Sequence, residues 1–199
     1  MPRRLLPPAA LCLVVAGVCF RAAPACEDEE RQAEANRRAG AAVRQLADAL
    51  DCEDFDRQAD DAARAHDLEH VMNQFGLRRK GGLGVGEKDP PAGVKDSIEL
   101  NIIDLGTKRP LKAADLAARK DVYLRMARHT QAIAALTGRY PPPPNPVRAK
   151  LWRTDVDDFR TRSKEFTDAV RSGDPVRVHR AAERLNDVCT RCHGFPEDR

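Results

Sequence analysis

The sequence predicts an all-α protein. Apolar residues recur at helical spacing along almost the whole chain of 199 residues, and no stretch alternates convincingly with a period of two. Asx-Pro pairs and glycines separate the periodic stretches, as they do at helix starts and ends. We therefore expect an antiparallel four-helix bundle with an extra N-terminal helix and a long glycine-rich first crossover.

Residues 1–25 have the features of a secretory signal peptide. An apolar run of 12 residues extends from Ala9 to Phe20, and Ala23-Pro24-Ala25 is the small-x-small pattern of a signal-peptidase site. The run is too short to cross a hydrocarbon core, which needs roughly 20 residues, so no membrane span is expected. Cys26 follows the cleavage site and leaves lipid attachment as an alternative. We expect ordinary cleavage after Ala25 and a periplasmic protein.

Removal of this segment changes what the charge and the cysteines indicate. It takes away three arginines and no acid, so 31 basic and 31 acidic residues remain and nothing points to nucleic-acid binding. Cys26, Cys52, Cys189 and Cys192 remain, in an oxidising compartment. A disulfide between Cys26 and Cys52 would need a hairpin near Gly40, because an unbroken helix would separate the sulfurs by roughly 39 Å.

The first half of the mature chain predicts three helices. Residues 26–54 form an N-terminal extension with a weakly apolar helix over 28–50. The next helix, over 55–75, has an apolar sector with Met72 near its middle. A glycine-rich connector follows, and Asp96 as N-cap begins a short helix to Gly106, with a strand through the same residues as the alternative.

The second half predicts three longer helices. One extends from Leu111 to Thr137 and includes His129, which we expect to be a hydrogen-bonded core residue. Asn145-Pro146 and Asp174-Pro175 are start signals for helices over 146–172 and 175–193. Apolar residues in both step by four and three, as helices packed at shallow angles require. Together with the helix over 55–75, these three should form the bundle, in a domain of residues 55–199.

The last predicted helix ends in Cys189-Thr190-Arg191-Cys192-His193, the C-x-x-C-H pattern of covalent haem attachment. Two cysteines three residues apart lie on one helix face, so both sulfurs can reach the vinyl groups of one porphyrin while His193 projects toward the iron. A structural zinc site and a thiol-disulfide redox pair are the alternatives. The first requires four ligands, and the second normally opens a helix after a strand.

These features resemble the class II c-type cytochromes, the cytochrome c′ family, over about residues 58–195. The resemblance rests on the C-terminal haem motif, the segment from Leu151-Trp152 to Phe166, and the Gly173-Asp174-Pro175 turn. It implies a haem c with His193 as proximal iron ligand, frequent dimerisation, and a role in periplasmic electron transfer or in the binding of small gases.

The sixth iron position has two candidate neighbours in the helix over 55–75. Met72 would be the ligand in a low-spin protein, although a methionine at this place can equally be core packing. Leu68 would leave the iron five-coordinate. His66 and His70 point away from the apolar sector and are interpreted as part of a solvated face.

Three functions remain open at this point. The first is a one-electron carrier with an unidentified periplasmic redox partner. The second is a haem protein that binds small gases, and the third is an exported helical interaction module without haem. No group of residues supports hydrolysis or group transfer, so no enzymatic activity is predicted.

Overall fold

The computed structural model describes residues 24–85 and 90–194, with residues 24–27 described by their backbone alone. Residues 1–23, which hold most of the predicted signal peptide, lie outside this part. The described residues confirm the all-α prediction: they contain no strand, and Leu77 and Ser97 form an isolated bridge. No helix in this part is long and apolar enough to span a membrane. The helices are α1 (Pro24–Asp48), α2 (Phe55–Ala65), α3 (Leu68–Met72), α4 (Ile98–Thr107), α5 (Ala113–Thr137), α6 (Pro146–Ser172) and α7 (Pro175–His193), with 3₁₀ turns η1 (Asn73–Phe75) and η2 (Arg78–Lys80).

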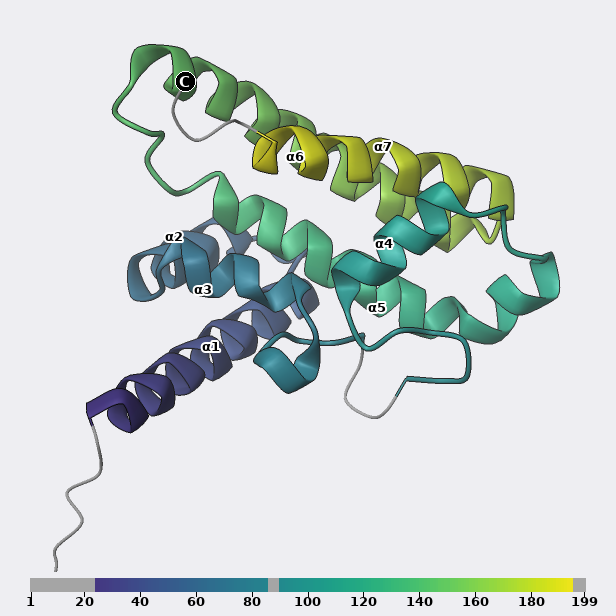
Figure 1. Cartoon of the computed structure of the whole chain (residues 1–199). Coiled ribbons are helices and arrows are strands. Elements are labelled where there is room, and N and C mark those ends of the chain that lie inside the picture. Colours follow the sequence, from purple (N-terminus) through teal and green to yellow (C-terminus); the bar gives the residue numbers. More distant parts are fainter. Residues whose placement is uncertain (1–23, 86–89, 195–199) are drawn as a thin grey trace, which may run out of the picture.

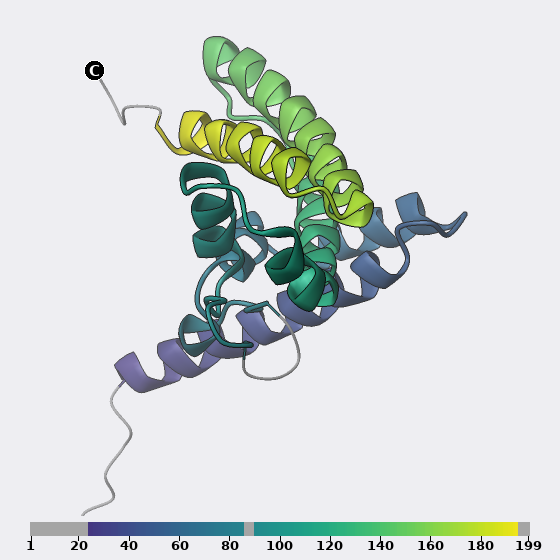
Figure 2. The same cartoon turned by 90° about the vertical axis from the view of Figure 1, so that its right-hand side faces the viewer.

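The three C-terminal helices pack in succession. α5 lies against α6 and α6 against α7, and the chain reverses direction at each connection (Figure 1). α4 covers another side of α7, and α1 crosses α5 and contacts α2 and α3 (Figure 2). The core between these helices includes fully buried side chains from α5, α6 and α7: Met126, Ile133, Leu136, Phe166 and Leu185.

Capping residues close in sequence determine where α6 and α7 begin and where α6 ends. Asn145 Oδ1 accepts hydrogen bonds from the backbone of Val147 and Arg148, at 3.0 and 3.1 Å, and so caps α6. Asp174 caps α7 in the same way, and a proline occupies the first turn of each helix. Gly173, at φ +71°, adopts the left-handed conformation that ends α6. The predicted bounds of both helices are confirmed.

The single helix predicted over 55–75 is wrong. The backbone of His66 and Asp67 is extended, so this segment divides into α2, α3 and η1. Tyr140 stabilises the break from outside, because its hydroxyl donates a 2.7 Å hydrogen bond to the carbonyl of His66. α2 and α3 contact α1 and α5, whereas α7 packs against α6 and α4. The helices therefore pack against one another, and the packed arrangement also includes α1 and α4.

Two smaller predictions are also corrected, and the hairpin that a disulfide between Cys26 and Cys52 would need is not formed at Gly40. α1 continues unbroken through Gly40, so the chain has no hairpin there, and Cys52 is an exposed free thiol. Ser97, not Asp96, is the N-cap of α4, because Asp96 is bound by Arg78. His129 is buried in the core as expected, but its Nδ1 has no hydrogen-bond partner among the described residues. The segment predicted as either helix or strand near Ile98 is helical.

Candidate haem site

A cavity of about 980 Å³ lies between the segment from α3 to η2 and the helices α4, α6 and α7. Its volume falls at the upper end of the range for small-molecule and cofactor sites, roughly 300–1,000 Å³. Much of its wall is aromatic or aliphatic. This apolar cavity is lined by Leu68, Met72, Phe75, Leu77, Ile102, Ile103, Trp152, Val156, Phe159 and Val188, together with Cys189, Cys192 and His193.

The last turn of α7 supplies one wall of the apolar cavity. Cys189 and Cys192 are half-buried there, and His193, the final residue of the helix, is exposed. Because α6 and α7 are antiparallel, the end of α7 faces the N-terminal half of α6, from which Trp152 and Phe159 also line the cavity. The three residues of the predicted haem motif therefore share one cavity with bulky apolar side chains.

Both cysteines are free thiols, and their surroundings favour the protonated form. Burial raises the pKa of Cys189 to about 11, with further contributions from Cys192 and Glu99. The pKa of Cys192 is raised as well, first by burial and then by Asp155, while Arg191 opposes this effect. Redox-active C-x-x-C pairs have lowered pKa values because the thiolate is the reacting species. The environment of these thiols therefore disfavours the thiol-disulfide interpretation.

Met72 lines the same apolar cavity from the end of α3. It is half-buried and packs against the hydrophobic core. Leu68, one turn earlier on α3, lines the cavity too. The structure therefore brings Met72 together with Cys189, Cys192 and His193, from helices that make no extensive contact with each other. Met126, the other methionine that could supply a thioether, is fully buried and is not part of the cavity wall.

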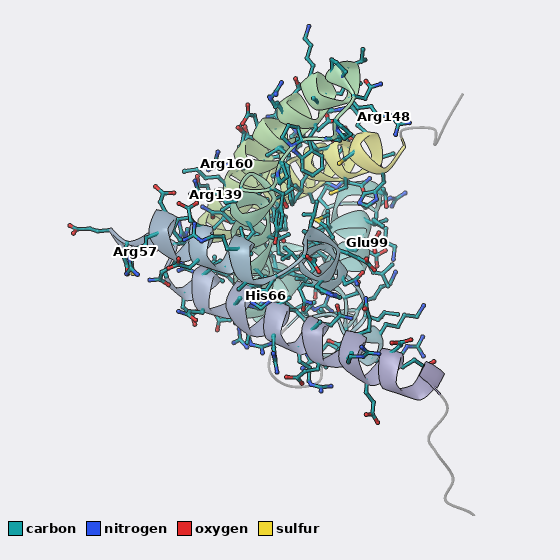
Figure 3. All side chains as sticks on the ribbon, turned by 90° about the vertical axis from the view of Figure 1, so that its left-hand side faces the viewer. Arg57, His66, Glu99, Arg139, Arg148 and Arg160 are labelled. Atoms are coloured by element: carbon teal, nitrogen blue, oxygen red, sulfur yellow. The ribbon has the colours of Figure 1, made fainter. Side chains whose placement is uncertain are left out.

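His66 and His70 border a different hollow, of about 1,070 Å³, between α1 and the α2–α3 junction. Charged side chains surround it, including Arg37, Arg38 and Glu34. Figure 3 shows His66 over α1, whereas Glu99, which lines the apolar cavity, lies on α4 nearer to α7. His70 Nδ1 is 3.1 Å from Asn36 Oδ1. Neither histidine lines the apolar cavity.

Three charged side chains of the apolar cavity were not anticipated from the sequence. Lys80 and Glu99 are exposed at its edge, and Asp155 on α6 is buried. Asp155 is three residues after Trp152 and four before Phe159, so its helical spacing places it on the same side as these two aromatic residues. This spacing is the signal in the sequence that could have identified Asp155 as a residue of the cavity wall. The partner of Asp155, Arg191, lies between the two cysteines of the motif.

Comparisons with protein families, with curated proteins and with solved structures each found no match. Within residues 24–85 and 90–194, no group of three or more His, Cys, Asp or Glu side chains is arranged to hold a metal ion directly.

Proposed function

We propose that this chain is an exported c-type cytochrome that carries one covalently bound haem and transfers single electrons. One arrangement supports this: Cys189, Cys192 and His193 share a large apolar cavity with Met72. Each thiol would add across one vinyl group, with the sulfur bonded to carbon and the proton retained on the neighbouring carbon. His193 would bind the iron, and the bound haem would supply the one-electron chemistry.

The lining and the volume of the apolar cavity fit a haem. Its aromatic and aliphatic wall would exclude water from a porphyrin face, and its volume is large for a cofactor site. The cavity also lies between α3 and α7, which make no extensive contact with each other. We propose that α3, α5, α6 and α7 would surround the haem in an arrangement of the cytochrome c′ kind.

Intact-protein mass spectrometry tests the proposal. Protein produced with a haem-maturation system should be heavier than the processed chain by one haem, and this mass should persist after denaturation. C189S/C192S should abolish it. C52S is the matched control, because Cys52 is an exposed thiol outside the apolar cavity. Wild-type protein without covalent haem from a competent host would contradict the proposal.

A five-coordinate haem protein that binds small gases is the second candidate. Leu68 supports it, because this residue lines the apolar cavity one turn before Met72 and could cover an open iron position. Absorption spectra of the reduced protein with and without carbon monoxide distinguish the two. Immediate carbon monoxide binding by a high-spin iron favours the gas-binding function.

Export to the periplasm is part of the proposal and rests on residues 1–25. N-terminal sequencing of the exported protein should begin at Cys26 with an ordinary amine. An acylated Cys26, or an intact Met1, would contradict it.

A further inference from the structure

The apolar cavity contains one buried charge among the described residues that line it. The Asp155 side chain is 7% exposed and lies in the wall formed by Trp152, Val156 and Phe159. An ionised carboxylate in such surroundings is unfavourable unless it is paired and hydrogen-bonded. The partner of Asp155 therefore determines how much negative charge the cavity contains.

That partner is Arg191, which lies between the two cysteines of the haem motif. Its Nε donates to Asp155 Oδ1 at 3.1 Å, and its Nη2 donates to Asp158 Oδ2 at 2.6 Å. One guanidinium thus binds two carboxylates on successive turns of α6. Since Arg191 is part of the last turn of α7, these bonds also hold the end of that helix against α6.

We propose that Arg191 is a positioning residue of the haem site. It holds Asp155 in a neutralised pair and fixes the last turn of α7, and through both effects it sets the midpoint potential of the iron. This inference rests on the proposed haem attachment. A carboxylate near the iron stabilises the more positively charged oxidised form and lowers the potential, and the guanidinium offsets this effect.

The chain provides a matched control on the same two helices. Arg184 also joins α7 to α6, through an ion pair with Glu165 at 3.3 Å, but neither residue lines the apolar cavity. Arg184 and Arg191 are seven residues, about two helical turns, apart. If ion pairs between α6 and α7 act only by holding the helices together, substitution of either arginine should change the midpoint potential. If the charge beside the cavity matters, only substitution of Arg191 should change it.

Redox titration of the haem-loaded variants tests the proposal. R191Q should shift the midpoint potential to a lower value, and D155N should shift it to a higher one. R191Q/D155N should return it close to wild type, and R191K, which keeps the charge, should remain near wild type. R184Q should leave the potential unchanged. An unchanged potential in R191Q, an equal shift in R184Q, or no reversal by D155N would overturn the inference.

Urea unfolding of the full chain without haem provides a second, independent measurement. R191Q should lower the urea midpoint more than R184Q does, because it leaves Asp155 buried without its partner. The effects of R191Q and D155N should be clearly non-additive. If the two substitutions lower stability additively, the pairing of Arg191 with Asp155 is overturned. Because this measurement needs no haem, failure of the inference can be distinguished from failure of the proposed function. If R191Q does not fold, the inference is overturned unless D155N raises the potential and R191K preserves it.

Discussion

Thr137 Oγ1 on α5 lies 3.8 Å from Met72 Sδ on α3. The same hydroxyl donates a 2.8 Å hydrogen bond to the carbonyl of Ile133. Because a threonine hydroxyl carries one proton, the shorter bond to the carbonyl uses it, and the contact with sulfur is mainly packing. The thioether of Met72 is therefore held against α5 while its lone pairs stay available.

Replacement of this thioether tests the sixth iron position. If Met72 is the ligand, wild type should be low-spin with a raised potential and slow carbon monoxide binding. M72A should convert the iron to high-spin, lower the potential and speed up carbon monoxide binding, as measured by absorption spectroscopy and redox titration.

M126L is the control for this experiment, because Met126 is fully buried in the core away from the apolar cavity. Its spectrum should match that of wild type. A wild-type ferrous protein that is already high-spin and binds carbon monoxide at once would make Met72 a packing residue and favour gas binding.

Tyr140 stabilises the break between α2 and α3 through one hydrogen bond, and Y140F tests this contribution. The substitution removes the hydrogen bond to the carbonyl of His66 and should lower the free energy of unfolding by about 1 kcal/mol. Burial raises the pKa of this phenol to about 12, so the hydroxyl remains a donor at neutral pH.

Urea unfolding measures the effect of Y140F, with Y123F as the control. Tyr123 is buried, and its hydroxyl makes no hydrogen bond to other described residues, so Y123F should be nearly neutral. Equal costs for the two substitutions would argue against a specific role for Tyr140.

The bounds of a helix could be predicted from the sequence where the residues that determine them are close in sequence. The caps at Asn145 and Asp174 are close in sequence to the backbone groups that they bind, so the bounds of α6 and α7 followed from sequence. The bounds could not be predicted where a residue distant in sequence determines them. The break at His66 is stabilised by Tyr140, 74 residues away, and Asp96 is occupied by Arg78 instead of capping α4.

The same distinction applies to the candidate site. Cys189, Cys192 and His193 form a continuous motif, whereas the bond between Asp155 and Arg191 spans 36 residues. Tertiary packing of α6 on α7 creates that pair. Helical spacing from Trp152 and Phe159 could have indicated which side of α6 Asp155 occupies, but it could not have identified Arg191 as the partner.

The contact between α4 and α7 depends on Gly106. A Cβ atom there would lie 2.7 Å from the backbone nitrogen of Glu183 and 2.8 Å from its Cα. Because this obstacle is backbone, G106A should force the helices apart and cost about 1–3 kcal/mol in unfolding free energy.

The matched control is G138A, whose Cβ would lie 3.4 Å from the flexible side chain of Arg160 at an ordinary φ of −69°. Urea unfolding should show little change for it. If G106A is equally tolerated, the close approach of α4 to α7 is not required. Since α4 and α7 both line the apolar cavity, G106A should also lower the yield of covalent haem.

His129 makes folding sensitive to acid. Burial, together with the positive charges of Arg44 and Arg125, lowers its pKa from 6.5 to about 4, with Asp48 opposing and Arg128 contributing least. Its buried Nδ1 also lacks a hydrogen-bond partner in the part of the chain that the structure describes. The folded state therefore binds this proton less readily than the unfolded state does. The contribution of His129 to stability is fully present above pH 6.5 and is lost as the pH falls toward 4.

A pKa lowered from 6.5 to about 4 corresponds to a loss of about 3 kcal/mol across that window. H129Q has no titrating group at this position, so the unfolding free energy of wild type minus that of H129Q isolates the histidine from the carboxylates that also titrate in acid. Urea unfolding at intervals between pH 7.5 and pH 4 should show this difference falling by about 3 kcal/mol. A difference that stays constant with pH would mean that His129 titrates alike in the folded and unfolded chain, and one that grows in acid would mean that the folded protein stabilises its charged form.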